Sequence, residues 1–196
     1  MLAYRPDVAQ EALAEPVTRR VWGKLVSTGI WRNVELQVAN AADAADLVAL
    51  REAVSRHLTA QYGSGLWSSR MTEKGILFAI RRSTVYVARN DGRLVATFAL
   101  STRKPWAIDR KYFSASAQPL YLTGMEVLPD HQRQGLGRWC IDEIRRLGRE
   151  WPADAIRLDA WDAAAGAGEF YRKCGFREVG RATYRKAPLV YLEMLL

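Results

Sequence analysis

The sequence predicts a mixed α/β (α+β) domain with its elements in the order β-α-α-β-β-β-α-β-α-β-β. Three observations support this prediction. Apolar residues alternate with other residues over several short runs, which is the pattern of strands. Elsewhere they recur every three to four residues, which is the pattern of helices packed on one side. A turn signal at Asn90-Asp91-Gly92-Arg93 joins two β-rich runs and predicts a hairpin.

The first half of the domain is expected to begin with a strand over Val34–Val38 and to continue with two helices. Asn40 is expected to cap the first helix, and Gly63 to end it. The second helix, over Ser69–Ile80, is weakened by Gly75. Four apolar residues at helical spacing indicate the first helix, namely Leu47, Leu50, Val54 and Leu58.

The predicted hairpin pairs Thr84–Arg89 with Leu94–Ser101. Thr102–Pro119 then forms an irregular insertion rich in aromatic and charged residues. Leu120–Val127 is the next expected strand.

The last part of the chain alternates helices and strands. Leu136–Leu147 has one apolar stripe and predicts a helix. Ile156–Trp161 predicts a strand, and Ala163–Lys173 a short helix. Glu178–Ala182 and Leu189–Leu196 are expected to pair as the closing strands.

The length of 196 residues suits one domain with a substantial core. We assign this domain to residues 34–196. Residues 1–33 are expected to form a mobile or loosely docked N-terminal extension. The alternative is a homodimer contact through Trp22 and Trp31.

The chain is basic, with 29 Lys and Arg against 21 Asp and Glu and a net charge of +8. Such a balance suits nucleic acid, an anionic membrane surface or a polyanionic cofactor. The basic residues are scattered rather than clustered, which argues against nucleic acid. No apolar run is long enough to span a bilayer, and the charged N-terminus is unlike a secretory signal. We expect a cytoplasmic protein with neither a nucleic-acid nor a membrane partner.

No metal site is expected, because the chain has only two cysteines and two histidines and they are scattered. Cys140 lies on the apolar face of its predicted helix, and Cys174 precedes a helix end. His57 and His131 are remote from each other in sequence and from both cysteines.

The segment Val127–Arg138 joins a predicted strand to a predicted helix through a loop that contains two glycines. The first turn of a helix has N–H groups without partners and partial positive charge, so it suits a phosphate. Gly135 and Gly137 have no Cβ, so that an anion can approach the main chain. Arg133 and Arg138 add fixed charge beside the loop. The segment therefore predicts a phosphate-binding site.

Two familiar phosphate loops fit this segment poorly. A Walker loop needs Gly-Lys-Ser/Thr, whereas Arg138 and Trp139 follow Gly137. A dinucleotide fingerprint needs a third glycine where Cys140 stands. Asp159 ends a second apolar run about 20 residues on, as a ribose-binding acid would. A dinucleotide-binding oxidoreductase therefore stays an alternative.

A third kind of loop fits better. The pattern Gln132-x-x-Gly135-x-Gly137 resembles the Q/R-x-x-G-x-G/A signature of the GNAT superfamily of acyl-CoA-dependent N-acetyltransferases. Downstream, Tyr171-Arg172-Lys173-Cys174-Gly175-Phe176 resembles its second signature, Y-x-x-x-G-F. Two signatures in the right order are more specific than either alone. The resemblance implies a central mixed, mostly antiparallel sheet flanked by helices.

The resemblance implies acetyl-CoA as the co-substrate. Its pyrophosphate would lie on the loop, and its pantetheine arm would pair with the strand at Met125–Val127. The thioester would occupy a gap where the strands before and after the helix splay apart. Its oxygen would be polarised by the N–H of Met125 or Val127. The implied cofactor-binding residues are Met125, Val127, Gln132, Arg133, Gln134, Gly135, Leu136, Gly137 and Arg138.

The resemblance also implies the catalytic residues. Tyr171 matches the family tyrosine that protonates the leaving thiolate, and a phenol near pKa 10 suits that task. Glu126, in the strand beside the thioester, is the first choice of base. His57 and a water relay are the alternatives. Many relatives carry an Asn before the tyrosine helix, where it contacts the cofactor. This chain has no Asn there, so that contact is either made by Asp162 or missing.

The acceptor is expected to be a primary amine, on a small molecule or on a protein. The loop Tyr62–Trp67, with Trp106, Tyr112 and Phe113, is a candidate wall for its pocket. Besides an N-acetyltransferase and the oxidoreductase, two functions stay open. One is a non-catalytic acyl-CoA sensor, and the other is a nucleic-acid-binding protein, whose affinity would fall steeply with salt.

Overall fold

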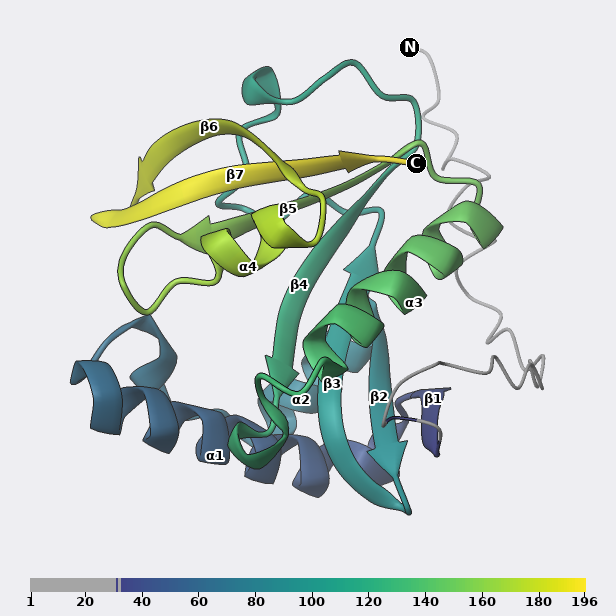
Figure 1. The fold of residues 1–196 in the computed structure, drawn as a ribbon, viewed down its shortest axis with the longest axis vertical. Helices are drawn as coiled ribbons and strands as arrows, with labels where there is room; N and C mark the ends of the chain where they lie inside the picture. Colours follow the sequence, from purple (N-terminus) through teal and green to yellow (C-terminus); the bar gives the residue numbers. More distant parts are fainter. Residues whose placement is uncertain (1–30, 32) are drawn as a thin grey trace, which may run out of the picture. The chain divides into compact units, whose positions relative to one another are not determined.

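The computed structural model describes residue 31 and residues 33–196. The expected extension, and the dimer contact through Trp22, therefore lie outside the described residues. The described elements follow the predicted order, β-α-α-β-β-β-α-β-α-β-β, and this part of the prediction is confirmed (Figure 1).

The chain enters the domain through strand β1 (Val34–Val38) and helix α1 (Ala44–Tyr62). The Asn40 side chain accepts from the N–H of Ala42 at 2.9 Å, and the Asp43 carboxylate accepts from the N–H of Asn40 at 2.8 Å. This capping box closes a short 3₁₀ turn that leads into α1. Gly63 ends α1 at a φ of +75°, as predicted for a glycine stop.

Two predicted helix starts are wrong. Helix α2 covers Glu73–Arg82 and begins only after Thr72, whose hydroxyl accepts from the N–H of Gly75 at 3.2 Å. Helix α4 is only Gly168–Lys173, because the preceding alanines form a turn closed by a 2.7 Å bond from the N–H of Gly166 to the carbonyl of Ala163. A Cβ at Gly166 would collide with the carbonyl oxygen of Trp161, so the turn requires glycine.

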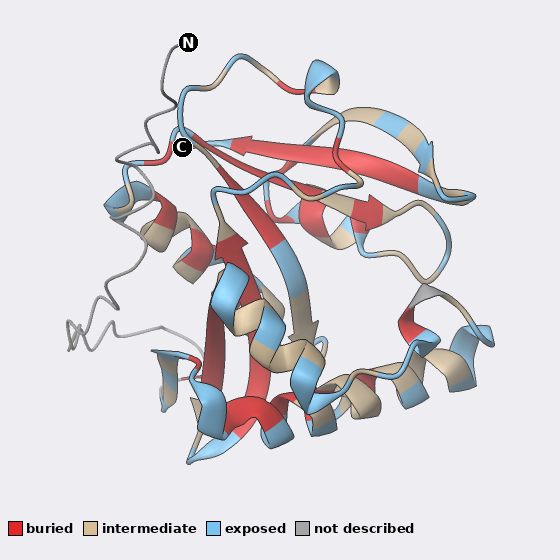
Figure 2. Ribbon diagram, turned by 180° about the vertical axis from the view of Figure 1, so that it is seen from behind, coloured by how far each residue is buried: buried red, intermediate tan, exposed pale blue. Residues whose placement is uncertain are grey.

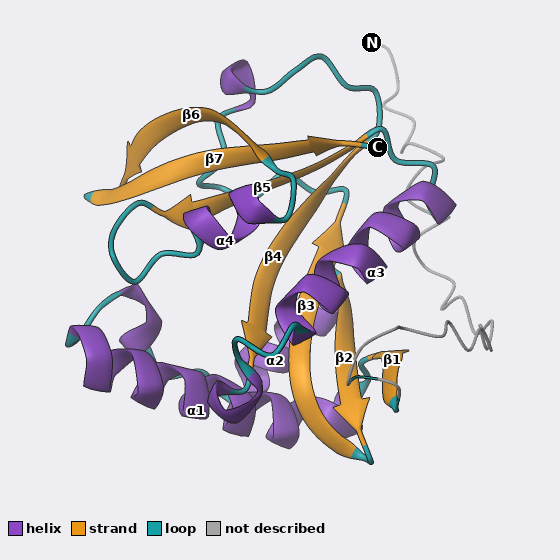
Figure 3. Ribbon diagram, viewed as in Figure 1, coloured by secondary structure: helices purple, strands orange, loops and turns teal. Residues whose placement is uncertain are grey.

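Within the described residues, seven strands form one sheet in the order β1-β2-β3-β4-β5-β7-β6. Only the β4–β5 pair is parallel, and every other neighbouring pair is antiparallel, as predicted (Figure 3). The predicted hairpin turn has Asp91 and Gly92 at positive φ. The remaining strands are β2 (Thr84–Asn90), β3 (Arg93–Ser101), β4 (Pro119–Val127), β5 (Ala155–Trp161), β6 (Arg177–Tyr184) and β7 (Ala187–Leu195).

Helices cover both faces of the sheet. Helix α3 (Leu136–Glu150) lies with α4 on the face nearer the viewer in Figure 1, and α2 lies on the opposite face. The strands of the middle of the sheet are largely buried in Figure 2. Leu136 and Ile141 of α3 are fully buried against them, together with Phe98 and Leu158. Within the described residues, no helix is both long and apolar enough to cross a membrane.

A buried ion pair fixes the 102–119 insertion to the sheet. The Nε of Arg157 in β5 lies 2.9 Å from the Oε1 of Glu193 in β7, and the two side chains are 3% and 1% exposed. The same guanidinium donates to the carbonyl of Ser114 in the insertion at 2.5 Å. The hydrogen bond offsets part of the cost of burying the two charges.

Candidate functional site

Strands β4 and β5 separate soon after they meet. They pair only at Pro119–Ala155, Leu120–Ile156 and Tyr121–Arg157, although both strands continue beyond these pairs. Figure 3 shows the two strands diverging from this common start. Their facing main-chain groups past Tyr121 have no partner in the sheet ladder, so the predicted gap between the strands is confirmed.

A bulge in β4 lies beside this gap. Thr97 pairs with Glu126 and Ala99 pairs with Thr123, so β4 has one residue more than β3 between these two pairs. Gly124 takes up the irregularity at a φ of +57°, in the left-handed region that favours glycine. A bulge bends a strand and changes the direction of the side chains that follow. It thereby sets the orientation of Met125 and Glu126.

The loop after β4 is held in place by side-chain to main-chain bonds. The Gln132 amide donates to the carbonyl of Val127 at 2.9 Å, and the Gln134 amide donates to the carbonyl of Asp130 at 2.8 Å. Arg133 and Gly135 both have positive φ, at +58° and +89°. The backbone therefore adopts the left-handed conformation at two positions shortly before α3 begins.

The start of α3 has no side-chain cap. The first N–H groups of a helix have no partner within the helix, and here Gly135 in the capping position has no side chain that could accept from them. Partial positive charge collects at this end. This helix start lies within the loop for which the sequence predicts phosphate binding, and that role of Gln134–Arg138 stays a prediction.

Gly137 and Arg138 connect this helix start to α4. A Cβ at Gly137 would lie 3.1 Å from the ring of Phe170, so the missing side chain makes room for that ring. The guanidinium of Arg138 donates to the carbonyl of Lys173 at 3.1 Å. Gly137 and Arg138 therefore contact α4, in addition to their predicted role in binding the cofactor. These contacts hold the helix that carries Tyr171 against the glycine loop.

Tyr171 is buried in α4, with 8% of its surface exposed. Its ring lies 5.2 Å from that of Phe170 and 5.5 Å from that of Phe176. Burial raises the pKa of its phenol well above the ordinary 10, and the nearby Cys174, Asp159 and Cys140 add to the rise. The hydroxyl therefore keeps its proton at neutral pH and is a weaker acid than an ordinary phenol.

Glu126, the predicted base, is in an ion pair with Arg51 of α1. Burial raises the pKa of its carboxyl, and the charge of Arg51 and its hydrogen bond oppose that rise. A carboxylate held by a guanidinium accepts a proton less readily than a free one. The structure thus places Glu126 beside the gap in a pairing that sequence reasoning did not predict.

Asp159 is a second carboxylate close to the gap. It lies in β5 two residues beyond Arg157, the last residue that pairs with β4. Burial raises the pKa of its carboxyl, and it contributes to the raised pKa of Tyr171. The sequence singled out Asp159 only as a ribose-binding acid. Sequence reasoning did not relate Asp159 to Tyr171, which lies twelve positions further along the chain.

A depression of about 390 Å³ lies between α1, the glycine loop and the turn before α4. His57 and Gln61 of α1 line it, as do Gln132, Arg133 and Gly166. The Nε2 atom of His57 lies 3.1 Å from the side-chain nitrogen of Gln61. The depression brings the predicted loop residues and the alternative base, His57, to one surface.

The aromatic residues expected to wall the acceptor pocket separate into two groups. The Trp67 ring packs 5.0 Å from that of Trp161 and 6.4 Å from that of Tyr62. Tyr112 and Phe113 instead pack on Tyr191, as part of a buried cluster. Trp106 is 90% exposed. Ring contacts between the described residues do not join the two groups.

Asp162, which stands where many relatives carry the cofactor-contacting Asn, has a protein partner. Its carboxylate pairs with the guanidinium of Arg181 in β6 at 2.9 Å.

A sequence model of the Acetyltransferase (GNAT) family matches residues 51–176, which is well over half of the chain. The chain belongs to the GNAT acetyltransferase family. This acetyltransferase is therefore an acyltransferase enzyme, and its glycine loop is of the third kind considered above rather than a Walker or dinucleotide loop. A search of curated proteins found no match to its sequence.

Solved structures share the fold of this acetyltransferase. The ribosomal-protein-S18-alanine N-acetyltransferase of Escherichia coli superposes with a TM-score of 0.61 at 14% identity, covering 83% of this chain and 93% of that one. The PaiA N-acetyltransferase of Thermoplasma acidophilum, solved with coenzyme A, superposes with a TM-score of 0.63 at 15% identity. The match covers 83% of this chain and 99% of that one. The ribosomal-protein-alanine N-acetyltransferase of Brucella melitensis gives 0.61 at 18%, covering 83% and 99%.

Proposed function

We propose that the protein transfers the acetyl group of acetyl-CoA to a primary amine by direct attack on the thioester. One observation carries this proposal: β4 and β5 part past Tyr121, and the loop after β4 leads into a helix start without a side-chain cap, onto which α4 packs through Phe170 and Gly137. The family assignment and a relative solved with coenzyme A support acetyl-CoA as the donor.

Acetyl-CoA would bind along the gap. Its pyrophosphate accepts hydrogen bonds from the main chain of Gln134–Arg138, where the helix dipole favours negative charge. Its pantetheine amides pair with the free edge of β4 at Met125–Val127, as an added strand would. The hydrogen bond from the Gln132 amide to the carbonyl of Val127 holds the loop, and Arg133 lines the depression. The N–H of Met125 or Val127 polarises the thioester oxygen.

The chemistry needs two proton movements. A neutral amine attacks the thioester carbon, a C–N bond forms, and the C–S bond breaks with its electrons going to sulfur. Tyr171 donates its proton to the thiolate, the base takes the one proton that the amine nitrogen loses, and that proton returns from the base to Tyr171 through solvent. The raised pKa of Tyr171 keeps the phenol protonated until negative charge develops on the sulfur.

The base that removes the amine proton is one of two carboxylates or a water relay. Glu126 is the predicted base, but its ion pair with Arg51 opposes proton uptake. Asp159 has a pKa raised by burial and no ion pair among the described residues, so it is the stronger candidate. A raised pKa moves a carboxylate toward the range in which a base works at neutral pH.

Replacing Tyr171 with Phe tests the catalytic role. We expect kcat to fall about 10²-fold or more, as is typical when a general acid is lost, with acetyl-CoA affinity unchanged. Thiol release from acetyl-CoA with a panel of amines measures the first, and calorimetry the second. Tyr184→Phe, in β6, is the matched control and should leave both values unchanged.

Two results would count against the proposal. Wild-type protein that releases no thiol with any amine, yet binds acetyl-CoA, would be a sensor instead. Thermal denaturation with acetyl-CoA, CoA, NAD and ATP tests the ligand itself, because a ligand that binds only the folded state must raise its stability. An increase with NAD and none with acetyl-CoA would overturn the proposal.

A further inference from the structure

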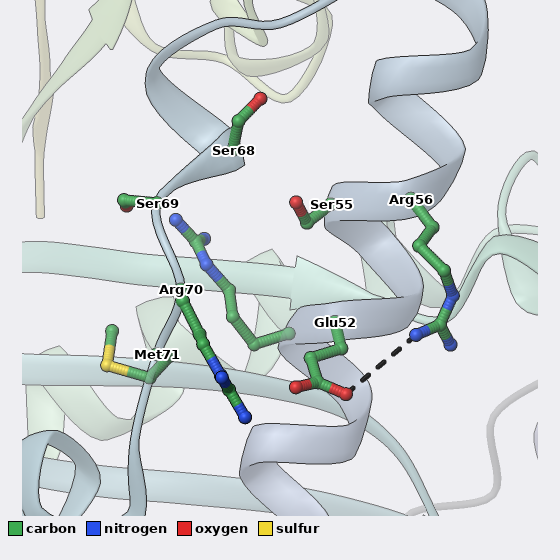
Figure 4. Close-up of a pocket in the computed structure, with 8 residues that line it drawn as sticks. Glu52, Ser55, Arg56, Ser68, Ser69, Arg70 and Met71 are labelled. Carbon is green, nitrogen blue, oxygen red and sulfur yellow. Dashed lines mark ion pairs between the residues drawn. The ribbon is translucent and has the colours of Figure 1, made fainter.

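A second cavity lies between α1 and the segment that leads into α2, away from the glycine loop. Its volume is about 300 Å³. Figure 4 shows Ser55 and Arg56 extending from α1, with Ser69 and Arg70 on the facing segment. Arg51 and Glu52 of α1 also line the cavity. This volume is at the lower end of the range for small-molecule sites.

The lining carries excess positive charge. It contains three arginines and one carboxylate, Glu52. Glu52 lies 3.8 Å from Arg56, but both side chains are well exposed, so the pair neutralises little of the charge. Arg70 takes part in none of the ion pairs between described residues. A guanidinium presents several donors in a fixed plane, which matches a carboxylate or a phosphate.

Arg51 connects this cavity to the gap between β4 and β5. Its Nη1 pairs with Glu126, which stands in β4 past the last residue paired with β5. Its Nε–H is buried and has no acceptor among the described residues. A buried donor without an acceptor destabilises the folded chain, so Glu126 alone leaves the hydrogen-bonding capacity of this guanidinium incomplete.

We propose that this cavity binds a carboxylate on the acceptor, so that the acceptors of this enzyme are small amines that also carry an acidic group. The inference rests on the proposed acetyltransferase function and names its substrate class. Arg51 and Arg70 hold the carboxylate, while the amine of the same molecule reaches toward the thioester. The ion pair with Glu126 orients the guanidinium of Arg51 between the cavity and the gap that separates β4 from β5.

Matched acceptors test the proposal. β-Alanine and γ-aminobutyrate are compared with their amides, which keep the amine and lose the charge. A charge-assisted hydrogen bond contributes about 1.5–3 kcal/mol, so kcat/KM should be roughly tenfold to a hundredfold higher for the acids. The phosphonate analogue of β-alanine is the third arm, and acetylation of the phosphonate in preference to the carboxylate would overturn the choice of carboxylate.

Arg70→Gln removes one cationic partner. We expect the KM for β-alanine to rise about tenfold, with kcat and the KM for acetyl-CoA unchanged. The ratio of β-alanine turnover to β-alaninamide turnover should fall in Arg70→Gln. Because this ratio is compared between the variant and wild type, the difference in basicity between the two amines cancels. Arg81→Gln, on an exposed part of α2 outside the cavity lining, is the matched control and should leave the ratio as it is in wild type.

A binding readout separates this inference from the proposed function. β-Alanine added to nitrogen-labelled protein should shift the arginine Nε–Hε signals, and β-alaninamide should not. Efficient acetylation of neutral amines with no preference for acids would overturn the inference and leave the proposed function standing. Failure to bind acetyl-CoA or to acetylate any amine would overturn both.

Discussion

Two carboxylates beside the gap show how single residues acquire their properties from their surroundings. Glu126 and Asp159 both have a pKa raised by burial, but only Glu126 has a cation, Arg51, beside it. The two carboxylates therefore have different assignments: Glu126 anchors an arginine, and Asp159 is a candidate base. The difference depends on α1, which contributes Arg51 and lies far from both carboxylates in sequence.

Asp159→Asn should stabilise the protein at neutral pH while lowering its activity. Burial raises the pKa of Asp159 in the folded state above the value of 3.8 that the carboxyl has in the unfolded state. Between these two pKa values, the folded state keeps the proton on Asp159 and the unfolded state has lost it. Stability is therefore lost as pH rises from 3.8 through the folded-state pKa, and the cost is fully present above that pKa. Asn has no charge to bury, so the variant avoids that cost.

Chemical denaturation across this pH range measures the effect. The variant should be more stable than wild type at neutral pH, and the difference should vanish below pH 3.8. Its kcat/KM should fall about 10²-fold if Asp159 is the base. An unchanged pH profile of kcat/KM in the variant would assign the proton transfer to Glu126 or to water.

At the scale of elements, the glycine loop and α4 act together. Gly135 turns the chain into α3, and Gly137 gives room to Phe170, which precedes Tyr171. The two glycines of the signature thus serve different needs, one of conformation and one of packing. The start of α3 and the tyrosine helix are consequently packed against each other.

Gly135→Ala should reduce both stability and acetyl-CoA affinity. A non-glycine residue in a left-handed conformation costs about 1–2 kcal/mol, and relief of that strain would turn the N–H groups away from the pyrophosphate. Gly92→Ala, in the hairpin turn at a φ of +82° with open space around it, is the matched control. It should lose similar stability and keep its affinity, measured by calorimetry. Equal affinity in both variants would contradict the assignment of the loop.

The buried Arg157–Glu193 pair fixes the insertion, so its loss should be costly. Glu193→Gln leaves Arg157 buried without its counter-charge, which typically costs about 3–5 kcal/mol. Glu178→Gln, which breaks more exposed pairs with Arg172 and Arg181, is the control and should cost less than about 1 kcal/mol. Urea denaturation measures both variants. A loss in Glu193→Gln no larger than in the control would show that the pair contributes little.

At the scale of the whole molecule, every described strand and helix lies within residues 34–196. The sheet, its helices, the gap and both cavities are all built from this part. We propose that residues 34–196 are the acetyltransferase domain, as the sequence predicts. The chemistry then requires nothing from residues 1–33.

Removal of residues 1–33 tests this domain assignment. The shortened chain should remain folded, with acetyl-CoA affinity within about twofold of the full chain, because the groups proposed to hold the ligand are all retained. Circular dichroism and calorimetry measure the two properties. Loss of folding or of binding in the shortened chain would show that the N-terminal residues belong to the domain.

The sequence by itself determined the order of the elements, the hairpin at Asn90–Arg93, the glycine loop and the match of Tyr171 to its family position. These features depend on local rules, such as the spacing of apolar residues and the conformations that glycine allows. Predicted boundaries failed where a local pattern was ambiguous. The alanines before Gly166 favoured a helix, whereas the close approach of the Trp161 carbonyl produced a turn.

Only the tertiary structure decided which residues meet. It paired Glu126 with Arg51, put Phe170 on Gly137 and moved Tyr112 and Phe113 into a buried cluster. It also formed the arginine-lined cavity from α1 and the segment before α2. Contacts between distant segments arise when the sheet closes and its helices pack, and no periodicity along the chain encodes them.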